Sequence, residues 1–339
     1  MPPPALAPRS RPLVIGHRGA SGHRPEHTES AYRLAIEAGV DAVEPDVVVS
    51  RDGVLVVRHE NEISGTTDVA NRPEFADRRT TKRVDGVKLT GWFVEDFLWS
   101  ELATLRSRER LPGLRPDNTA FDGLEPILRL RDVLALLDEH GAGQDRATAA
   151  VIELKHAHFL GQQGFDLAEL LATELQACGW ADRPEQLIVE SFELAPLDRL
   201  REIGLPAQLI FLLEHEGAPA DEAAEHGRRA RSYAWYRSDD GIDSLVGRVD
   251  GISLSKIDVL QDPAVVARAH ARGLTVFVWT LRPENRYLDP ASRTPGSSAA
   301  WGDWRAEWGR IAESGVDGIF VDHPELGVAM RDGLDLVGE

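Results

Sequence analysis

The sequence has almost none of the features that mark disulfide-stabilised or membrane-spanning proteins. Its 339 residues include one cysteine, Cys178, so no internal disulfide can form and the fold does not depend on an oxidising compartment. We interpret Cys178 as a small buried hydrophobe without a chemical role. No segment reaches the roughly 18 uninterrupted apolar residues of a membrane span, and the N-terminal MPPPALAPRSRP lacks the apolar region of a signal peptide. The sequence therefore predicts a cytoplasmic protein as given, or an exported one if a signal peptide has been removed.

Basic residues are scarce relative to acidic ones. Lys and Arg number 38 against 56 Asp and Glu, which gives a formal net charge of −18. Nucleic acids and anionic membranes require clustered Lys and Arg, so neither is expected as the main partner. A metal ion and a few cations gathered in one cleft can still bind a small anionic substrate. Composition leaves the oligomeric state open.

The chain does contain a regular alternation of short apolar runs with helical patterns. The strand candidates are PLVIGH (12–17), AVEPDVVV (42–49), VLVVRH (54–59), AVIELK (150–155), QLIVESF (186–192), AQLIFLL (207–213), GISLS (251–255), TVFVWTL (275–281) and DGIFVD (317–322). Alternation of this kind predicts a parallel sheet. A closed barrel accepts eight parallel strands, which is one fewer than the candidates.

A hairpin accounts for the extra strand. The second and third candidates are joined by SRDG, which is too short for a parallel crossover and suits an Asp-Gly turn. Folding the third run back predicts a TIM (β/α)8 barrel with a β-hairpin excursion after strand 2. A two-residue turn at 52–53 pairs Asp46 with His59 and places Glu44 on the same face, unless a bulge at Pro45 shifts the register by one.

We interpret the whole chain, residues 1–339, as a single barrel domain. Residues 60–125 form an insertion rich in Gly, Pro, Arg and Asp, with one helix expected in VEDFLWSELATL. So long a stretch between barrel elements is typical of a cap over the active-site end.

Polar side chains end the first three parallel strands, which is where barrels of this kind carry their working residues. His17 and Arg18 end the first strand, Glu44 and Asp46 the second, and Glu153 and Lys155 the third. Three converging carboxylates would repel one another unless a cation neutralised them. All-oxygen ligation suits Ca²⁺ or Mg²⁺ better than zinc, so we expect one divalent cation as cofactor.

The cations and histidines suit the cleavage of a phosphodiester. The metal can polarise a phosphoryl oxygen while Arg18 binds another bidentately and Lys155 adds a point charge. His17 and His59 arrive from different strands, so one can accept a proton from the attacking group while the other donates to the leaving oxygen. Each of these residues alone is more often structural, and only their joint placement at successive strand ends favours catalysis.

The same residues resemble a known family in order and spacing. The matching segments are HRG (17–19), PEHT (25–28), GVDAVEPDVVVSRDGVLVVRHE (39–60), IELK (152–155), VWT (278–280) and GVDGIFVDHPE (315–325). Together they resemble the glycerophosphodiester phosphodiesterases from about Leu13 to about Gly327. The long insertion resembles that of a bacterial branch with exported, calcium-dependent members.

The resemblance implies a role for each matching residue. The acid/base pair falls on His17 and His59, the phosphate-binding arginine on Arg18, and the metal carboxylates on Glu44, Asp46 and Glu153. The resemblance also implies hydrolysis of glycerophosphodiesters, such as glycerophosphocholine, to glycerol 3-phosphate and an alcohol. The nucleophile is either water or the neighbouring hydroxyl of the substrate, which would form a cyclic phosphate.

The chain departs from the family pattern at two positions. His27 stands where the family usually has Asn, and Glu60 stands where it usually has Asp. We interpret Glu26 and Thr28 as a helix start, with Thr28 as the N-cap.

Two strand-end residues each have two expected roles. Trp279 ends the seventh parallel strand, where it either contacts substrate or packs in the core. Glu190 is expected to order Lys155 or a water.

Two other functions stay open at this point. One is a related barrel phosphodiesterase that acts on lysophospholipids or inositol phosphodiesters, and an acyl chain would require an apolar channel. The other is a non-catalytic protein that binds polyol phosphates, and the intact histidines and carboxylates count against it.

Overall fold

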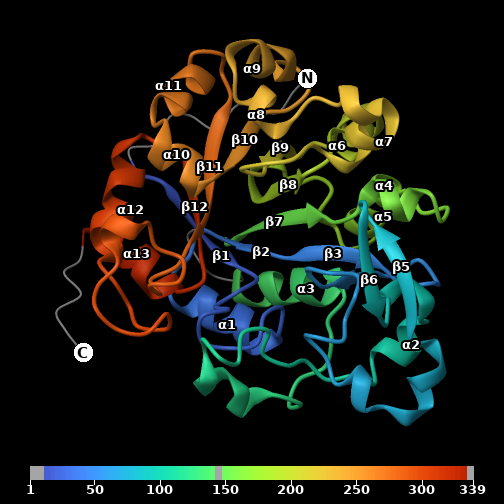
Figure 1. Ribbon diagram of the computed structural model, residues 1–339. Coiled ribbons are helices and arrows are strands. Elements are labelled where there is room, and N and C mark those ends of the chain that lie inside the picture. The colour runs from blue at the N-terminus through green and yellow to red at the C-terminus, as the bar shows by residue number, and fades with distance from the viewer. Residues whose placement is uncertain (1–10, 142–146, 334–339) are drawn as a thin grey trace.

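The strands of the computed structural model, which describes residues 11–141 and 147–333, close into a barrel surrounded by helices (Figure 1). The barrel strands are β1 (Leu13–His17), β2 (Ala42–Glu44), β3 (Asp46–Val49), β7 (Ala149–Leu154), β8 (Leu187–Ser191), β9 (Gln208–Leu213), β10 (Gly251–Ser255), β11 (Thr275–Leu281) and β12 (Gly318–Val321). Neighbouring strands pair in the order β2-β1-β12-β11-β10-β9-β8-β7-β3, and a further β2–β7 pairing closes the circle. All these pairings are parallel. Since β2 and β3 are halves of one strand broken at Pro45, the predicted (β/α)8 barrel is confirmed.

Helices cover the outside of the barrel. The α-helices are α1 (Glu29–Glu37), α2 (Trp99–Leu102), α3 (Leu130–Gly141), α4 (Ala157–Gly161), α5 (Leu167–Ala177), α6 (Leu194–Ile203), α7 (Ala220–His226), α8 (Tyr233–Tyr236), α9 (Asp239–Leu245), α10 (Lys256–Gln261), α11 (Ala264–His270), α12 (Trp304–Glu313) and α13 (Pro324–Asp332). The 3₁₀-helices are η1 (Val69–Asn71), η2 (Pro73–Arg78), η3 (Val94–Asp96), η4 (Pro116–Phe121), η5 (Pro184–Gln186), η6 (Gly227–Arg229) and η7 (Pro290–Ser292). Across residues 11–141 and 147–333, we find no helix with the length and apolar character that crossing a bilayer requires.

The predicted hairpin is present, but its predicted register is wrong by one residue. In the antiparallel pairing of β3 with β4 (Leu55–Val57), Val47 faces Val57, so Asp46 stands opposite Arg58 and not His59. The turn has three residues and not two, because Ser50 N donates to Val54 O and Gly53 adopts a φ of 81°. A type I turn followed by a left-handed glycine is the usual three-residue hairpin connection.

The predicted insertion, residues 60–125, has a small core of its own. A hairpin of β5 (Thr80–Val84) and β6 (Val87–Gly91) rises from it at the side of the barrel (Figure 1). Buried apolar side chains, among them Phe75 and Phe97, pack against the β3–β4 hairpin. The single helix expected in VEDFLWSELATL is divided into η3 and the short α2.

One further sequence interpretation needs correction. Cys178 is half-buried at the end of α5, where it packs against the main core, so it is not a fully buried residue.

Candidate active site

The alternation of side chains along each barrel strand builds the site on an apolar floor. A buried cluster fills the barrel interior with Leu13, Ile15, Ala42, Val151, Ile188, Ile210, Phe277 and Phe320. Successive residues of a strand face opposite sides, so the residue two positions further along faces the interior again. Beyond the cluster, those next residues are His17, Glu44, Glu153, Glu190, Leu212, Trp279 and Asp322, most of which are polar. The carboxyl ends of the strands therefore place a polar layer directly above the apolar one.

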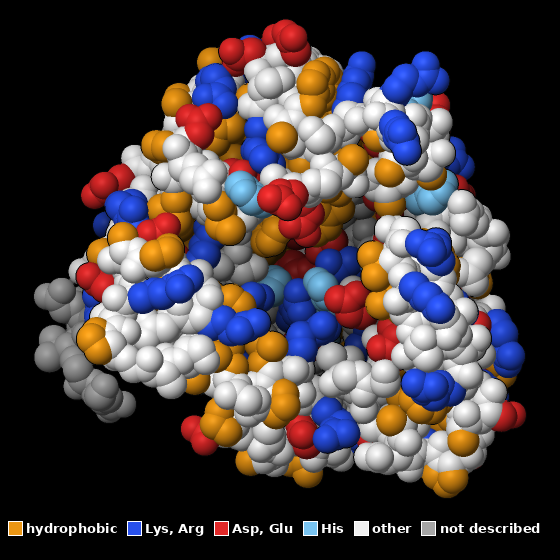
Figure 2. Space-filling model, in the orientation of Figure 1, with side chains coloured by type: hydrophobic (Ala, Val, Ile, Leu, Met, Phe, Trp, Pro, Cys, Tyr) orange, Lys and Arg blue, Asp and Glu red, His pale blue; other side chains and the backbone are white. Residues whose placement is uncertain are grey.

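A cavity of about 1340 Å³ opens above this layer. Its walls include His17, Arg18, Glu44, His59, Glu153, Lys155, Glu190 and Trp279. Figure 2 shows the hollow, with histidine, basic and acidic side chains gathered at its floor. Of the residues predicted from the sequence for the site, Asp46 alone is absent from the cavity wall, and it lies just behind Lys155.

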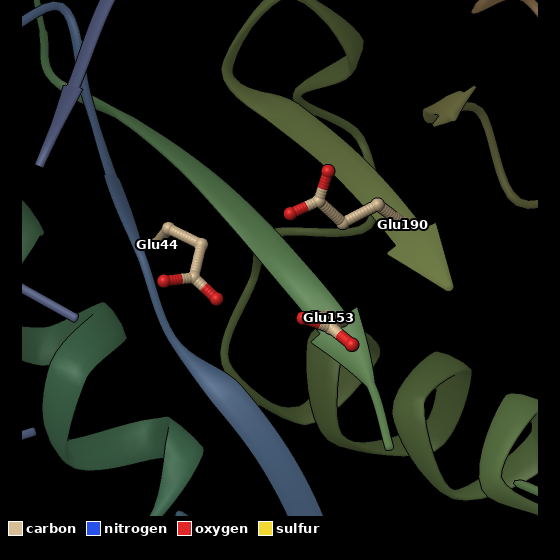
Figure 3. A group of neighbouring side chains, drawn as sticks. All are labelled: Glu44, Glu153 and Glu190. Atoms are coloured by element: carbon tan, nitrogen blue, oxygen red, sulfur yellow. The ribbon is translucent and has the colours of Figure 1, made fainter. Parts of the chain in front are cut away.

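Three carboxylates from neighbouring strands converge in the cavity. Oxygens of Glu44, Glu153 and Glu190, which end β2, β7 and β8, lie within 4.8 Å of one another (Figure 3). Burial, together with the charges of nearby carboxylates, raises the pKa of Glu44 and of Glu190 well above the usual range. Glu190 was not predicted as part of a carboxylate cluster, and its Oε2 has no hydrogen-bond partner among the described residues.

The fourth carboxylate, Asp46, is held in its ionised form. Its Oδ2 accepts a hydrogen bond from His27 Nε2 at 2.8 Å and lies 3.3 Å from Arg18 Nε. Burial would raise the pKa of Asp46, but Lys155 and other cationic groups bring it well below the usual range. Asp46 Oδ1 and Glu153 Oε1 lie 3.3 and 2.7 Å from Lys155 Nζ, and neither forms a hydrogen bond of good geometry.

This set of donors fits a hard divalent cation. Asp46 Oδ1, Glu153 Oε1 and Glu190 Oε2 are buried without a hydrogen-bond partner among the described residues. Carboxylate oxygens are the ligand type that Ca²⁺ and Mg²⁺ prefer. A cation would also remove the repulsion that keeps the buried carboxyls protonated. The structure thus brings together the predicted ligands Glu44 and Glu153, with Glu190 beside them. The alternation of side chains along the strand QLIVESF would have indicated that Glu190 faces the barrel interior.

The two histidines are each anchored by a carboxylate. His17 Nδ1 lies 2.7 Å from Asp322 Oδ1, and His59 Nδ1 lies 2.7 Å from Glu60 Oε1. Although burial would raise both pKa values, Arg282 and Arg115 keep the pKa of Asp322 well below its usual range, and the rings of His156 and His59 lower the pKa of Glu60. Both carboxylates are therefore ionised, and each accepts a hydrogen bond from the Nδ1–H of its histidine. Nε2 of each ring is then left free to accept a proton.

Burial keeps both imidazoles neutral. It lowers the pKa of His17 to about 4, with a further lowering by Arg18, and it lowers that of His59 well below the usual range. Two neutral imidazoles at the floor of one cavity are suited to accepting protons at neutral pH.

Arg18 occupies a conformation that directs it into the site. Its φ is 58°, its backbone N donates to Glu44 Oε2 at 2.9 Å, and its Nη1 donates to Glu26 Oε2 at 2.8 Å. Glu26 is therefore a partner of Arg18 rather than only part of a helix start. Thr28 does act as the predicted N-cap of α1, since its side chain accepts from Ala31 N.

The remaining predicted residue, Trp279, has both of the expected environments. It is partly buried, its ring contacts Phe192 with 5.6 Å between centroids, and its Nε1 donates to Ser253 O. It also lines the cavity, as Phe192 does.

The two departures from the family pattern have structural partners. His27 is fully buried and bridges Asp46 and Tyr32, with 2.7 Å between its Nδ1 and the tyrosine hydroxyl. Glu60 bonds the ring of the preceding His59.

The tip of the β5–β6 hairpin lines the cavity, and a hydrogen bond between Asp85 of the hairpin and His156 of the barrel holds it there. His156 Nδ1 lies 2.5 Å from Asp85 Oδ2. Burial opposes charge on His156, but its hydrogen bond with Asp85 and the nearby carboxylate of Glu60 raise its pKa from 6.5 to about 9. Charged His156 thus stabilises the docked hairpin fully below pH 6.5, and this contribution is lost as the pH rises through about 9.

We expect backbone amides of residues 80–91 to exchange hydrogen faster at alkaline pH than the intrinsic rate predicts. Native-state hydrogen exchange at several pH values measures this directly. His156→Gln should remove the pH dependence, whereas equal protection on both sides of the transition would contradict the assignment.

Known proteins share both the sequence pattern and the fold. The model of the glycerophosphoryl diester phosphodiesterase family matches residues 17–326. The chain is 30% identical over 335 residues to glycerophosphodiester phosphodiesterase GDPD6 of Arabidopsis thaliana, covering 92% of this chain and 84% of the relative. It is 25% identical over 345 residues to a glycerophosphodiester phosphodiesterase of Treponema pallidum, covering 94% and 91%. The chain therefore belongs to the glycerophosphoryl diester phosphodiesterase family and is an enzyme of this class.

Two solved structures show the same fold. A putative glycerophosphoryl diester phosphodiesterase from Silicibacter pomeroyi has a TM-score of 0.68 at 23% identity, covering 97% of this chain and 96% of the other. A phosphodiesterase from Oleispira antarctica, in complex with the product sn-glycerol-3-phosphate, has a TM-score of 0.63 at 19% identity, covering 95% and 97%. Membership in an enzyme family removes the non-catalytic binding protein from the alternatives.

Proposed function

We propose that this enzyme hydrolyses glycerophosphodiesters, such as glycerophosphocholine or glycerophosphoethanolamine, to glycerol 3-phosphate and an alcohol. The observation that carries this proposal is the placement of two carboxylate-anchored histidines, His17 and His59, beside a cluster of buried carboxylates in one cavity. The product named in the Oleispira antarctica complex supports glycerol 3-phosphate as the product here.

Glu44, Asp46 and Glu153 would hold one divalent cation, Ca²⁺ or Mg²⁺, with Glu190 beside them. Bound there, the cation neutralises the carboxylates and polarises a phosphoryl oxygen. Arg18 and Lys155 face the same cavity and supply positive charge for the other phosphoryl oxygens. Burial would lower the pKa of both side chains, but surrounding carboxylates raise it, so both stay charged.

The histidines carry the proton transfers. One Nε2 accepts a proton from the attacking hydroxyl, and the other imidazole, after taking up a proton from solvent at its Nε2, donates that proton to the departing alcohol oxygen. The carboxylates behind them stabilise each imidazolium as it forms, since Asp322 and Glu60 accept a hydrogen bond from Nδ1–H throughout. Trp279 and Phe192 form an apolar wall against the carbon atoms of the substrate.

Release of glycerol 3-phosphate from glycerophosphocholine by metal-stripped protein tests this function. Adding back Ca²⁺ or Mg²⁺ is expected to restore release in the wild type and not in Asp46→Ala. No release with either metal, from protein that circular dichroism shows to be folded, would contradict the proposed reaction.

A second candidate substrate is favoured by the rim of the cavity. Val87 and Ile257 line it and are 59% and 43% exposed, and Phe159 and Leu260 add apolar surface. Such a rim can accommodate the acyl chain of a lysophospholipid. Faster turnover of lysophosphatidylcholine than of glycerophosphocholine in the same assay would favour this substrate class.

A further inference from the structure

Two arginines of the insertion, Arg110 and Arg115, reach into the active site from outside the barrel. The turn between them is tight, since the backbone N atoms of Leu114 and Arg115 both donate to Leu111 O. This turn lets side chains five residues apart in the sequence bind different acidic residues of the site. Neither arginine was predicted from the sequence as a site residue.

Arg115 holds the carboxylate that anchors His17. Its Nη2 donates to Asp322 Oδ2 at 2.6 Å, and Asp322 Oδ1 accepts from His17 Nδ1 at 2.7 Å. The same guanidinium donates through Nε to Glu284 Oε1 at 2.8 Å and through Nη1 to Ser21 O at 2.9 Å. Arg115 is 7% exposed and Asp322 is 1% exposed, so water does not compete for these bonds.

Arg110 holds the carboxylate that anchors Arg18. Its Nε and Nη2 donate to the two oxygens of Glu26 at 2.7 and 2.6 Å, and Glu26 Oε2 also accepts from Arg18 Nη1 at 2.8 Å. Its Nη1 lies 3.6 Å from Glu60 Oε1, the oxygen that bonds His59. Each of the two arginines is thus linked to a residue of the catalytic layer through a single intervening carboxylate.

Fixed carboxylates matter because a proton-transferring ring must be held in one orientation. A buried carboxylate with a single partner can rotate, whereas Asp322 is held by His17 on one oxygen and by Arg115 and Arg282 on the other. Arg110 binds both oxygens of Glu26, and such a bidentate pair adds directional restraint that a point charge does not supply. Small displacements of reacting groups cost large factors in rate.

We infer that Arg110 and Arg115 form an arginine clamp through which the insertion positions Arg18 and His17 for the reaction. Arg115 sets the ring orientation of His17 through Asp322. Arg110 sets the guanidinium of Arg18 through Glu26. This inference rests on the roles proposed above for His17 and Arg18, and neither clamp residue touches substrate, so both are positioning residues.

The two arms of the clamp predict different kinetic changes. Arg115→Met should lower kcat by about 10- to 100-fold with little change in KM, because His17 acts in the chemical step. Arg110→Met should mainly raise KM, because Arg18 binds the phosphate in the ground state as well as in the transition state. Arg115→Lys keeps the charge but cannot make all three contacts, so its kcat should lie between those of the wild type and Arg115→Met. It replaces Arg115→Met in the test if the methionine variant does not fold.

Arg78→Met is the matched control. Arg78 lies in the same insertion and makes a bidentate ion pair with Glu101, but it contacts no residue of the catalytic layer. It should leave kcat and KM unchanged, because it removes an ion pair of the insertion without touching the catalytic layer. Equal losses of activity in the Arg78 and Arg115 variants, or unchanged kinetics in folded Arg115 and Arg110 variants, would overturn the clamp.

A readout independent of turnover separates this inference from the proposed function. The Nδ1–H proton of His17 should give a downfield NMR resonance in the wild type that shifts or broadens in the Arg115 variants. The indole Nε1–H of the buried Trp180, which donates to Asp138 Oδ2 at 3.2 Å, provides the reference signal that should not move. An unmoved His17 resonance overturns the clamp even if the enzyme is active, whereas a moved resonance in a wild type that releases no glycerol 3-phosphate supports the clamp and contradicts only the proposed reaction.

Discussion

Replacing His17 or His59 with alanine is expected to lower kcat for glycerophosphocholine by about 100- to 10,000-fold, the range typical of a positioned acid or base. Each ring faces the cavity and is anchored through Nδ1, so its loss removes a proton transfer rather than a structural contact. Binding of the cation, followed by calorimetry, should change little. Steady-state release of glycerol 3-phosphate measures the effect.

His270→Ala is the control for this pair of substitutions. His270 bonds Asp317 at 2.8 Å, as His17 bonds Asp322, but it lies on the surface and outside the cavity wall. Its activity should match the wild type. If His17→Ala or His59→Ala retains activity within a factor of about two, that residue is not part of the acid/base pair.

Glu44→Gln is expected to abolish turnover and at the same time to stabilise the metal-free protein. Glu44 is 1% exposed. Because glutamine has nearly the same size as glutamate, the substitution removes the charge of a proposed ligand without opening a cavity. The loss of cation affinity should exceed the roughly 10- to 100-fold cost of removing an outer-shell partner of a metal ligand. Calorimetric titration with Ca²⁺ and Mg²⁺ measures it.

The stabilising effect follows from the direction of the pKa shift. Burial, and then the charges of Asp46 and Glu153, raise the pKa of Glu44 well above 4.5. The unfolded chain therefore loses this proton at lower pH than the folded chain does, and the metal-free protein loses stability as the pH rises above 4.5. Glutamine cannot ionise, so the variant should keep that part of its stability at neutral and alkaline pH.

Thermal unfolding in chelator and in excess cation separates the two effects. Cation should raise the unfolding midpoint of the wild type, because a ligand that binds only the folded state stabilises it, and should not raise that of Glu44→Gln. The exposed Glu313→Gln on α12 should behave as the wild type in both conditions. Undiminished cation affinity in Glu44→Gln would remove Glu44 from the ligand set.

Much of the fold was accessible from local patterns. Short apolar runs alternating with helices predict parallel strands, and the closeness of the second and third runs predicts the hairpin that reduces the count to eight. Because parallel strands of a barrel end on the same face, residues at strand ends such as His17, Glu44 and Glu153 had to meet. That rule applies to any such barrel, so it needs no knowledge of distant contacts.

The hairpin register shows where local patterns fail. The sequence SRDG allows a two-residue or a three-residue turn, and the choice moves every pairing by one. The hydrogen bond from Ser50 N to Val54 O, with the left-handed Gly53, selects the longer turn. His59, the partner expected for Asp46, consequently stands one residue beyond Arg58, the residue that faces Asp46 in the structure.

The sequence by itself determined the barrel, its hairpin, and the strand-end positions of the proposed catalytic and metal-binding residues, since these follow from periodicity and from the polarity of parallel strands. Only the tertiary structure decided which groups anchor them: Asp322 behind His17, Glu26 behind Arg18, and the clamp arginines behind both. Except for Arg18 and Glu26, these partners lie far apart in the sequence, and no local pattern connects them. Arg115 and Asp322, for example, are 207 positions apart. Their pairing is set by the packing of the insertion against the barrel, which brings their charges into a common buried space where each requires a partner.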